Sequence, residues 1–272
     1  MKIDKRFMFS GHAIGVSAHF HRLDDVHNLN HFIPTLGSSV LSPVGGRSHH
    51  EVKNFFYTAD EPRRRILLSA QHVEATAHGS ETDDQFETET RVFVRGVSVL
   101  EKLHVGVVEL EQSATRAIDS PTSLIRTKVA KIEDLRLGNV TVHVQLDREP
   151  FENCCTKQEL LDFYGKQDDS YRRENGWRFS SAPQPTAVEE INGRVFATLV
   201  KKIDLEGPAD ELRTMKVDGH TIYWEGFGKI YLGEVMMRDE DRHVNMIRLK
   251  MGSDGGGSGL IGGGQTNGGT VP

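Results

Sequence analysis

The sequence predicts an all-β fold, largely an antiparallel sandwich or barrel. Three observations lead to this class. Apolar and polar residues alternate with a period of two along most of the chain, and clusters of Gly, Pro, Asp and Asn interrupt this pattern at short intervals. Strands and helices also do not alternate regularly, as they would in a doubly wound α/β fold.

The expected strands follow from this alternation. The first begins near residue 7, and from Ile14 the residues Val16, Ala18 and Phe20 share one face of it, with His19 on the other. Further strands are expected at residues 52–57, 66–77, 90–94, 96–111, 124–132, 139–146, 194–203, 220–224, 229–237 and 243–251.

One short helix is expected over 156–165. Thr156 and Glu159 have the spacing of a capping box, and Gly165 is a typical helix stop. Residues 151–185 form a connection. The β-rich body, 1–251, is therefore either one domain or two parts, 1–150 and 186–251, on either side of that connection.

The C-terminal stretch is rich in glycine. Residues 252–272 contain 10 of the 27 glycines and few bulky apolar side chains. Ordering such a segment costs more backbone entropy than ordering any other composition. We expect either a flexible tail or an extended segment bound to a strand edge, and in an assembly we expect it to contact a neighbouring subunit.

Composition excludes several classes of protein. The net charge of −6 argues against a dedicated nucleic-acid binder, and no apolar run is long enough to span a bilayer. The adjacent Cys154 and Cys155 cannot form a disulfide scaffold. No phosphate-binding glycine loop precedes a helix, so no cofactor is expected.

Histidine offers one metal hypothesis. Seven of the 13 histidines lie in the first 50 residues, and His19 and His21 would share a strand face about 7 Å apart. That spacing suits two ligands of one ion. The alternative is that both are polar residues on the outer face of a strand.

Two other groups of residues could carry chemistry. Tyr223, Trp224, Phe227 and Tyr231 could form a stacking platform for a sugar or small ligand, or they could fill the core. Cys154 and Cys155 precede the expected helix, where the helix dipole can lower the pKa of a thiol. The alternative is that they are ordinary reduced thiols.

Three segments resemble bacterial β proteins of the choice-of-anchor P type. They are Gly-His-Ala-Ile-Gly-Val-Ser-Ala at 11–18, the segment 96–111, and Leu232-Gly233-Glu234 followed by Val244-Asn245-Met246-Ile247. The resemblance implies a non-enzymatic β protein. Such proteins are usually secreted and poor in charge. This chain is rich in charge, and its N-terminus does not resemble a signal peptide.

Together these observations favour a non-enzymatic structural or interaction protein that self-associates as a homo-oligomer. The alternatives are a small-molecule or carbohydrate-binding module that uses the aromatic residues at 223–231, and a metal-dependent enzyme that uses His19 and His21. We expect a cytoplasmic location; non-classical export would instead make the protein surface-associated.

Overall fold

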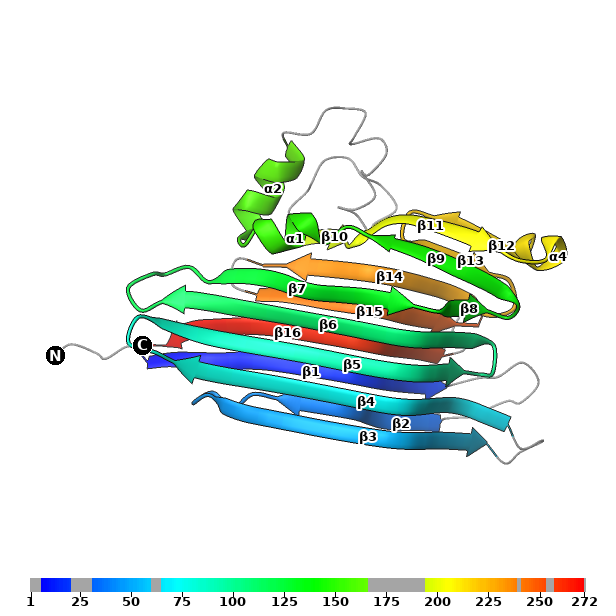
Figure 1. Ribbon diagram of the computed structural model, residues 1–272, viewed down its shortest axis with the longest axis horizontal. Helices are drawn as coiled ribbons and strands as arrows, with labels where there is room; N and C mark the ends of the chain where they lie inside the picture. Colours follow the sequence, from blue (N-terminus) through cyan, green and yellow to red (C-terminus); the bar gives the residue numbers. More distant parts are fainter. Residues whose placement is uncertain are drawn as a thin grey trace.

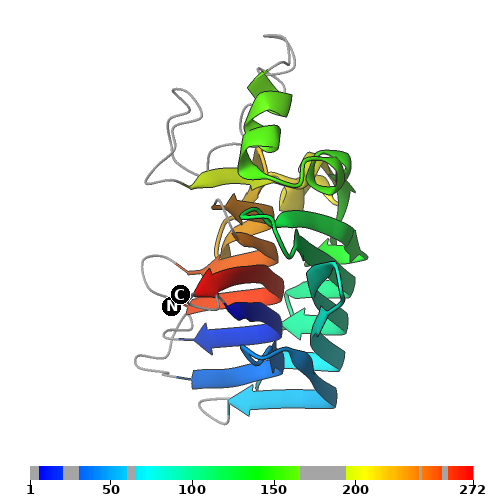
Figure 2. The same ribbon diagram turned by 90° about the vertical axis from the view of Figure 1, so that its left-hand side faces the viewer.

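The computed structural model describes residues 6–20, 31–59, 65–165, 194–238, 241–252 and 257–271. Most of them belong to two antiparallel sheets that pack face to face (Figures 1 and 2). The predicted all-β sandwich is therefore confirmed. In this part of the chain, no helix has the length and apolar character needed to cross a bilayer.

The strands of the two sheets come from all parts of the described chain. Sheet I has the order β12 (Met215–Asp218), β13 (Thr221–Trp224), β14 (Gly228–Met237), β15 (Asp241–Met251), β16 (Gly257–Val271), β1 (Arg6–Phe20) and β2 (His31–Val40), and β10 (Val195–Thr198) also pairs with β14. Sheet II has the order β11 (Val200–Glu206), β9 (Val140–Leu146), β8 (Leu135–Leu137), β6 (Leu103–Ala117), β5 (Gln85–Val99), β4 (Arg65–Glu81) and β3 (Gly46–Ala59), and β7 (Leu124–Glu133) also pairs with β6.

The sheets enclose a shared core. β1 packs on β4 and β5, and β16 packs on β5 and β6. One cluster of buried side chains extends from Ala13 to Ile261. The described strands of 1–150 and 186–251 share both sheets, because β1 and β2 complete the sheet formed by the C-terminal strands, and β11 pairs with β9.

Of the two expectations for the glycine-rich segment, the structure shows the extended segment at a strand edge. Gly257–Val271 is not a flexible tail but β16, an antiparallel strand between β1 and β15 (Figure 1). The strand edges that order it belong to the same chain. The absence of bulky side chains hid this strand, because its backbone rather than an alternating pattern holds it in place.

Two further strand predictions need correction. Residues 96–111 are not one strand, since β5 and β6 meet in a tight turn at Leu100 and Glu101, both with positive φ. Such turns usually carry Asn or Gly, and neither residue stands here, so the turn could not be recognised from its residues. Residues 194–203 divide at Leu199, where the chain crosses from β10 in sheet I to β11 in sheet II. The strand β2 was not predicted.

The predicted helix is confirmed as α2 (Lys157–Gly165). Its capping box is formed: the Glu159 N–H donates to Thr156 Oγ1 at 3.2 Å, and the Cys155 and Thr156 N–H groups donate to the Glu159 carboxylate. The short helices α1 (Glu149–Asn153) and α4 (Ala209–Leu212) were not predicted. The rest of the expected connection, 166–185, lies outside the described residues.

Each sheet is bent along one line that crosses its strands. In sheet I the line runs through Gly37, Gly15, Gly262, Met246 and Gly233, and φ is near +60° at Gly37, Gly262 and Gly233. In sheet II it runs through Asn54, Gln71, Gly96, Gly106 and Asp134, with positive φ at Asn54, Gly96 and Asp134. The line in sheet I packs closely on sheet II, because a Cβ added at Gly15 would lie 2.0 Å from Val73 Cγ1 on β4.

The bend shifts the alternation of buried residues by one position without changing the strand pairing. On β1, Ala13 is buried before the bend and Val16, Ala18 and Phe20 after it. Ile14 was predicted to share the face of Val16, but it lies on the opposite face because the bend separates them.

Candidate functional site

The structure gives no support to the predicted histidine pair. His19 lies on the outer face of β1, with its ring 5.8 Å from that of Phe32, and His21 lies outside the described residues. Across the described ranges, no three His, Cys, Asp or Glu side chains are grouped to hold a metal ion. The metal hypothesis therefore stays a prediction without a described ligand set.

The four predicted aromatic residues do not form one platform. Phe227 is buried, and Trp224 stacks on it with ring centroids 4.9 Å apart. Tyr223 instead faces Lys229 Nζ at 5.0 Å, and Tyr231 faces the guanidinium carbon of Arg248 at 3.8 Å. One pair thus contributes to packing against the core, while each tyrosine has a cation over its ring.

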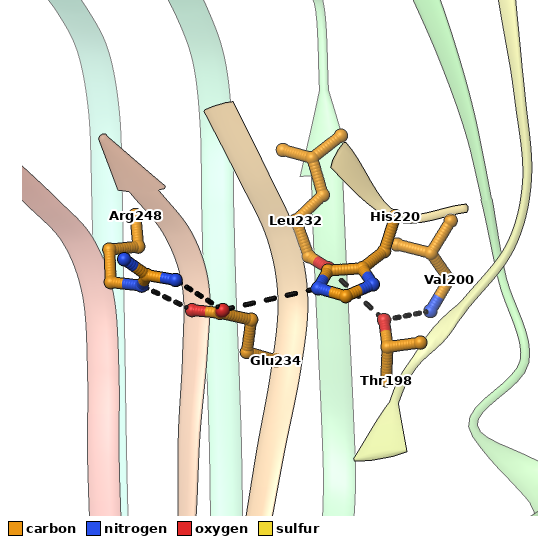
Figure 3. A network of polar contacts seen from close by, with 6 residues as sticks. All are labelled: Thr198, Val200, His220, Leu232, Glu234 and Arg248. Carbon is orange, nitrogen blue, oxygen red and sulfur yellow. Dashed lines mark hydrogen bonds and ion pairs between the residues drawn. The ribbon is translucent and has the colours of Figure 1, made fainter. Parts of the chain in front are cut away.

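A polar cluster that the sequence analysis missed lies beside Tyr231 on sheet I. Glu234 on β14 accepts two hydrogen bonds from Arg248 on β15, from Nε and Nη2, both at 2.6 Å (Figure 3). His220, which immediately precedes β13, lies with Nε2 3.9 Å from Glu234 Oε1. The neighbouring strands β14 and β15, and the start of β13, thus bring these three side chains together, although they are separated in the sequence.

Thr198 anchors the same region where the chain leaves sheet I. Its hydroxyl donates to the Leu232 carbonyl at 3.1 Å and accepts the Val200 N–H at 3.1 Å (Figure 3). The Leu199 N–H also donates to the Gly233 carbonyl at 2.7 Å. The crossover from β10 to β11 is therefore fixed directly against the strand that carries Glu234.

The pKa of Glu234 decides whether its carboxylate can act as a general base. Burial alone would raise its pKa, but the hydrogen bonds and charge of Arg248, together with the nearby His220, lower the pKa to about 2. The carboxylate raises the pKa of Arg248 in turn. Glu234 is thus ionised at neutral pH and already neutralised, which makes it a poor general base.

The cluster borders a small recess of about 280 Å³, and Phe196, His243 and Asn245 also line it. Imidazole and amide groups there can exchange hydrogen bonds with a small polar molecule. The groups of the recess that sequence reasoning missed come from separate strands, so only the strand register could have revealed them.

The adjacent cysteines are not activated. Both are buried beside α1 and α2, and burial is the main cause that raises the pKa of each thiol. The expectation that the helix start lowers a thiol pKa is therefore wrong here, because loss of solvent outweighs the dipole. Buried, protonated thiols are weak nucleophiles.

The edge strand β2 forms a second candidate site, as a comparison with the strands at the other ends of the two sheets shows. β12, β11 and β3 all carry charged residues, among them Lys216, Lys202 and Lys53. β2 has the sequence HFIPTLGSSV, without Asp, Glu, Lys or Arg, and among the strands that the structure describes it pairs only with β1. On β2, Phe32 is 66% exposed and Val40 is 61% exposed. β2 is thus an open strand edge without protecting charges.

Comparison with known proteins assigns the chain to a protein family. Residues 7–238 match the family described as Domain of unknown function (DUF8256). The chain belongs to the DUF8256 family. No curated protein and no solved structure matches the chain.

The DUF8256 match covers β1 to β14 and therefore includes His220, Glu234 and the β2 edge. It ends before β15 and β16, so Arg248 and the glycine-rich strand lie beyond the matched residues of this family member. The match carries no description of an activity, and the resemblance to choice-of-anchor P proteins stays a prediction.

Proposed function

We propose that the protein is a non-enzymatic interaction protein whose subunits self-associate through β2. The observation that supports this most is the uncharged open edge of β2, with Phe32 and Val40 exposed on it. Natural sheets usually protect their edges with charges, because an open edge can pair with another chain. The strands at the other ends of the two sheets, β12, β11 and β3, have such charges, whereas the short β10 (VFAT), which pairs with β14, has none.

A two-fold axis is the simplest arrangement for this contact. If two β2 strands pair antiparallel about a two-fold axis at Leu36, Phe32 of each copy lies opposite Val40 of the other. Aromatic and β-branched residues make favourable cross-strand pairs. Pro34 lacks an N–H, and the Ser38 N–H already donates to His50 Nδ1 at 3.1 Å, so the side chains would contribute much of the contact.

The alternative functions have less support. A small-molecule or carbohydrate site at 223–231 needs rings that act together, whereas Phe227 is buried and each tyrosine faces a cation. A metal-dependent enzyme needs further ligands beside His19. The Glu234 carboxylate is already paired with Arg248, and both thiols are buried.

The test measures molecular mass by light scattering and native mass spectrometry. We expect the wild-type chain to form a dimer and the double variant Phe32→Lys, Val40→Lys to be a monomer. Both side chains face solvent, so the fold is expected to survive, which circular dichroism checks. Phe56→Lys is the matched control, because Phe56 is 65% exposed on β3 and should not affect the mass. A wild-type monomer, or a double variant of unchanged mass, would refute the proposal.

A further inference from the structure

The bend of sheet II creates a groove on its outer face. The groove measures about 600 Å³ and includes all five residues of the bend line, from Asn54 on β3 to Asp134 beside β8. The side chains of Gln71 and Asp134 lie over the two glycines of this line: a Cβ added at Gly96 would be 2.4 Å from Gln71 Cδ, and one added at Gly106 would be 2.6 Å from Asp134 Cβ. The groove runs across five neighbouring strands, which at ~4.8 Å per strand gives a length of roughly 20 Å.

The groove carries two arginines that are not in ion pairs. Arg95 on β5 and Arg136 on β8 are exposed and line the groove. Of the carboxylates that the structure describes, none forms an ion pair with either guanidinium. In contrast, Arg91 on the same face of β5 is bound to Glu109 at 2.8 Å. Asp134 also lines the groove, so its formal charge is +1 from two arginines and one carboxylate, and the two guanidinium groups remain available to a ligand.

Aromatic and amide groups also line the groove, beside Asp134. The exposed Phe56 and the half-buried Phe93 supply ring faces. Asn54 and Gln71 supply amide groups. Aromatic faces beside hydrogen-bonding side chains are typical of sites for amphipathic ligands.

We propose that this groove binds an acidic oligosaccharide that lies across the strands. Arginines bind carboxylate or sulfate groups through paired hydrogen bonds, amide side chains bind hydroxyl groups, and the rings pack on the apolar faces of the sugars. β4, β5 and β6 are paired on both sides, so a peptide could not add there as a strand. Of the two phenylalanine rings in the groove only Phe56 is exposed, whereas a single-stranded nucleic acid stacks its successive bases on several rings.

The proposal does not depend on self-association, because β2 lies in the other sheet. The test titrates the full chain with an oligogalacturonate and with the fully methyl-esterified oligomer of the same length. We expect calorimetry to show binding of the acidic oligomer, with affinity falling as salt increases and about tenfold weaker binding of the neutral ester.

Variants locate the site. Arg95→Gln with Arg136→Gln should weaken binding by about tenfold or more, and Phe56→Ala should weaken it independently of charge. Arg91→Gln is the matched control, on the same strand and face, and should leave the affinity unchanged. Unaltered thermal unfolding would show that the variants remain folded.

Two results would overturn the proposal. One is that the acidic oligomer does not bind, or binds equally well to the double arginine variant. The other is that a single-stranded polynucleotide binds more tightly than the oligogalacturonate with the same sensitivity to the arginines, which would assign the groove to nucleic acid.

Discussion

Arg242 is the largest fully buried side chain among the described residues. Its guanidinium donates to the Phe151 carbonyl at 2.5 Å, to the Cys154 carbonyl at 2.8 Å and to Thr127 Oγ1 at 3.3 Å. Burial lowers its pKa to about 10, so it stays protonated at neutral pH. Backbone carbonyls at the end of α1 thus replace water around this cation and attach the helix to β15.

Removing this anchor should expose the thiols. In Arg242→Met we expect Cys154 and Cys155 to react with a disulfide reagent about tenfold faster than in the wild type, because the contact that holds α1 opens more often. Stopped-flow or manual absorbance measurements give the rate. Arg248→Met is the control, since that side chain lies on the outer face of sheet I. Equal rates in Arg242→Met and the wild type would mean that other contacts hold α1.

Glu234 should make stability depend on pH in a defined range. Its pKa is about 2 in the folded protein and 4.5 without perturbation, so the folded state favours the ionised form. The contribution is complete above pH 4.5 and is lost as the pH falls towards 2. It amounts to at most about 3 kcal/mol.

Urea unfolding of Glu234→Gln tests this. The difference in unfolding free energy from the wild type should be largest near neutral pH and should shrink below pH 4.5, the unperturbed value. Glu206→Gln is the control, because its carboxylate is 80% exposed and paired only with His143 at the surface. A difference for Glu234→Gln that does not vary with pH would contradict the assignment.

The cluster around Glu234 could not be predicted from the sequence. The chain has 39 acidic residues, and nothing near Glu234 in the sequence sets it apart. Its partner Arg248 is chosen by the pairing of β14 with β15, which is a property of the folded sheet. The capping box of Thr156 and Glu159 could be predicted, because all of its contacts lie within one turn of helix.

At the scale of elements, the bend lines explain why some faces were assigned wrongly. A period of two predicts one buried face for each strand, but every long strand of these sheets changes phase where it crosses the bend. Gly262 illustrates the requirement: its φ is +69°, and an added Cβ would lie 2.6 Å from Val108 Cγ1. One sequence cannot reveal that glycines on separate strands fall in one line.

Two glycine variants distinguish the cost of a positive φ from the cost of crowding the core. Gly226 lies in the turn between β13 and β14, and Gly262 lies on the bend line of sheet I. Gly226 has φ of +73° and nothing within 4 Å of an added Cβ, so Gly226→Ala should cost about 1 kcal/mol. Gly262→Ala has the same strain and also crowds Val108, so it should cost about 3 kcal/mol. Chemical denaturation measures both. Equal losses would show that the core adapts to the added methyl group without cost.

For the whole molecule, the all-β class followed from composition and periodicity, while the topology did not. β16 has too few side chains to show a pattern, and β2 contains Pro34 and Gly37, which interrupt one. These strands fill the middle and one end of sheet I. Their places depend on contacts between distant parts of the chain.

Removing β16 should therefore disrupt the fold and not merely shorten a tail. A chain ending at residue 252 loses the partner of both β1 and β15, which leaves two open edges inside sheet I. We expect this truncated chain to aggregate or to lose cooperative thermal unfolding, as seen by light scattering and calorimetry. A soluble truncated chain with the wild-type unfolding temperature would show that β1 and β15 can close the sheet directly.

The position of β16 also sets an order of events during translation. β1 leaves the ribosome before the other described strands, but its neighbour β16 is synthesised only after all of them. The run from β3 to β6 pairs each strand with the next, so this part of sheet II can form on the nascent chain. β1 must wait with one edge unpaired, and contacts this distant in sequence form slowly. A holding chaperone on the nascent chain would therefore matter most for sheet I, in the interval before residues 257–271 emerge.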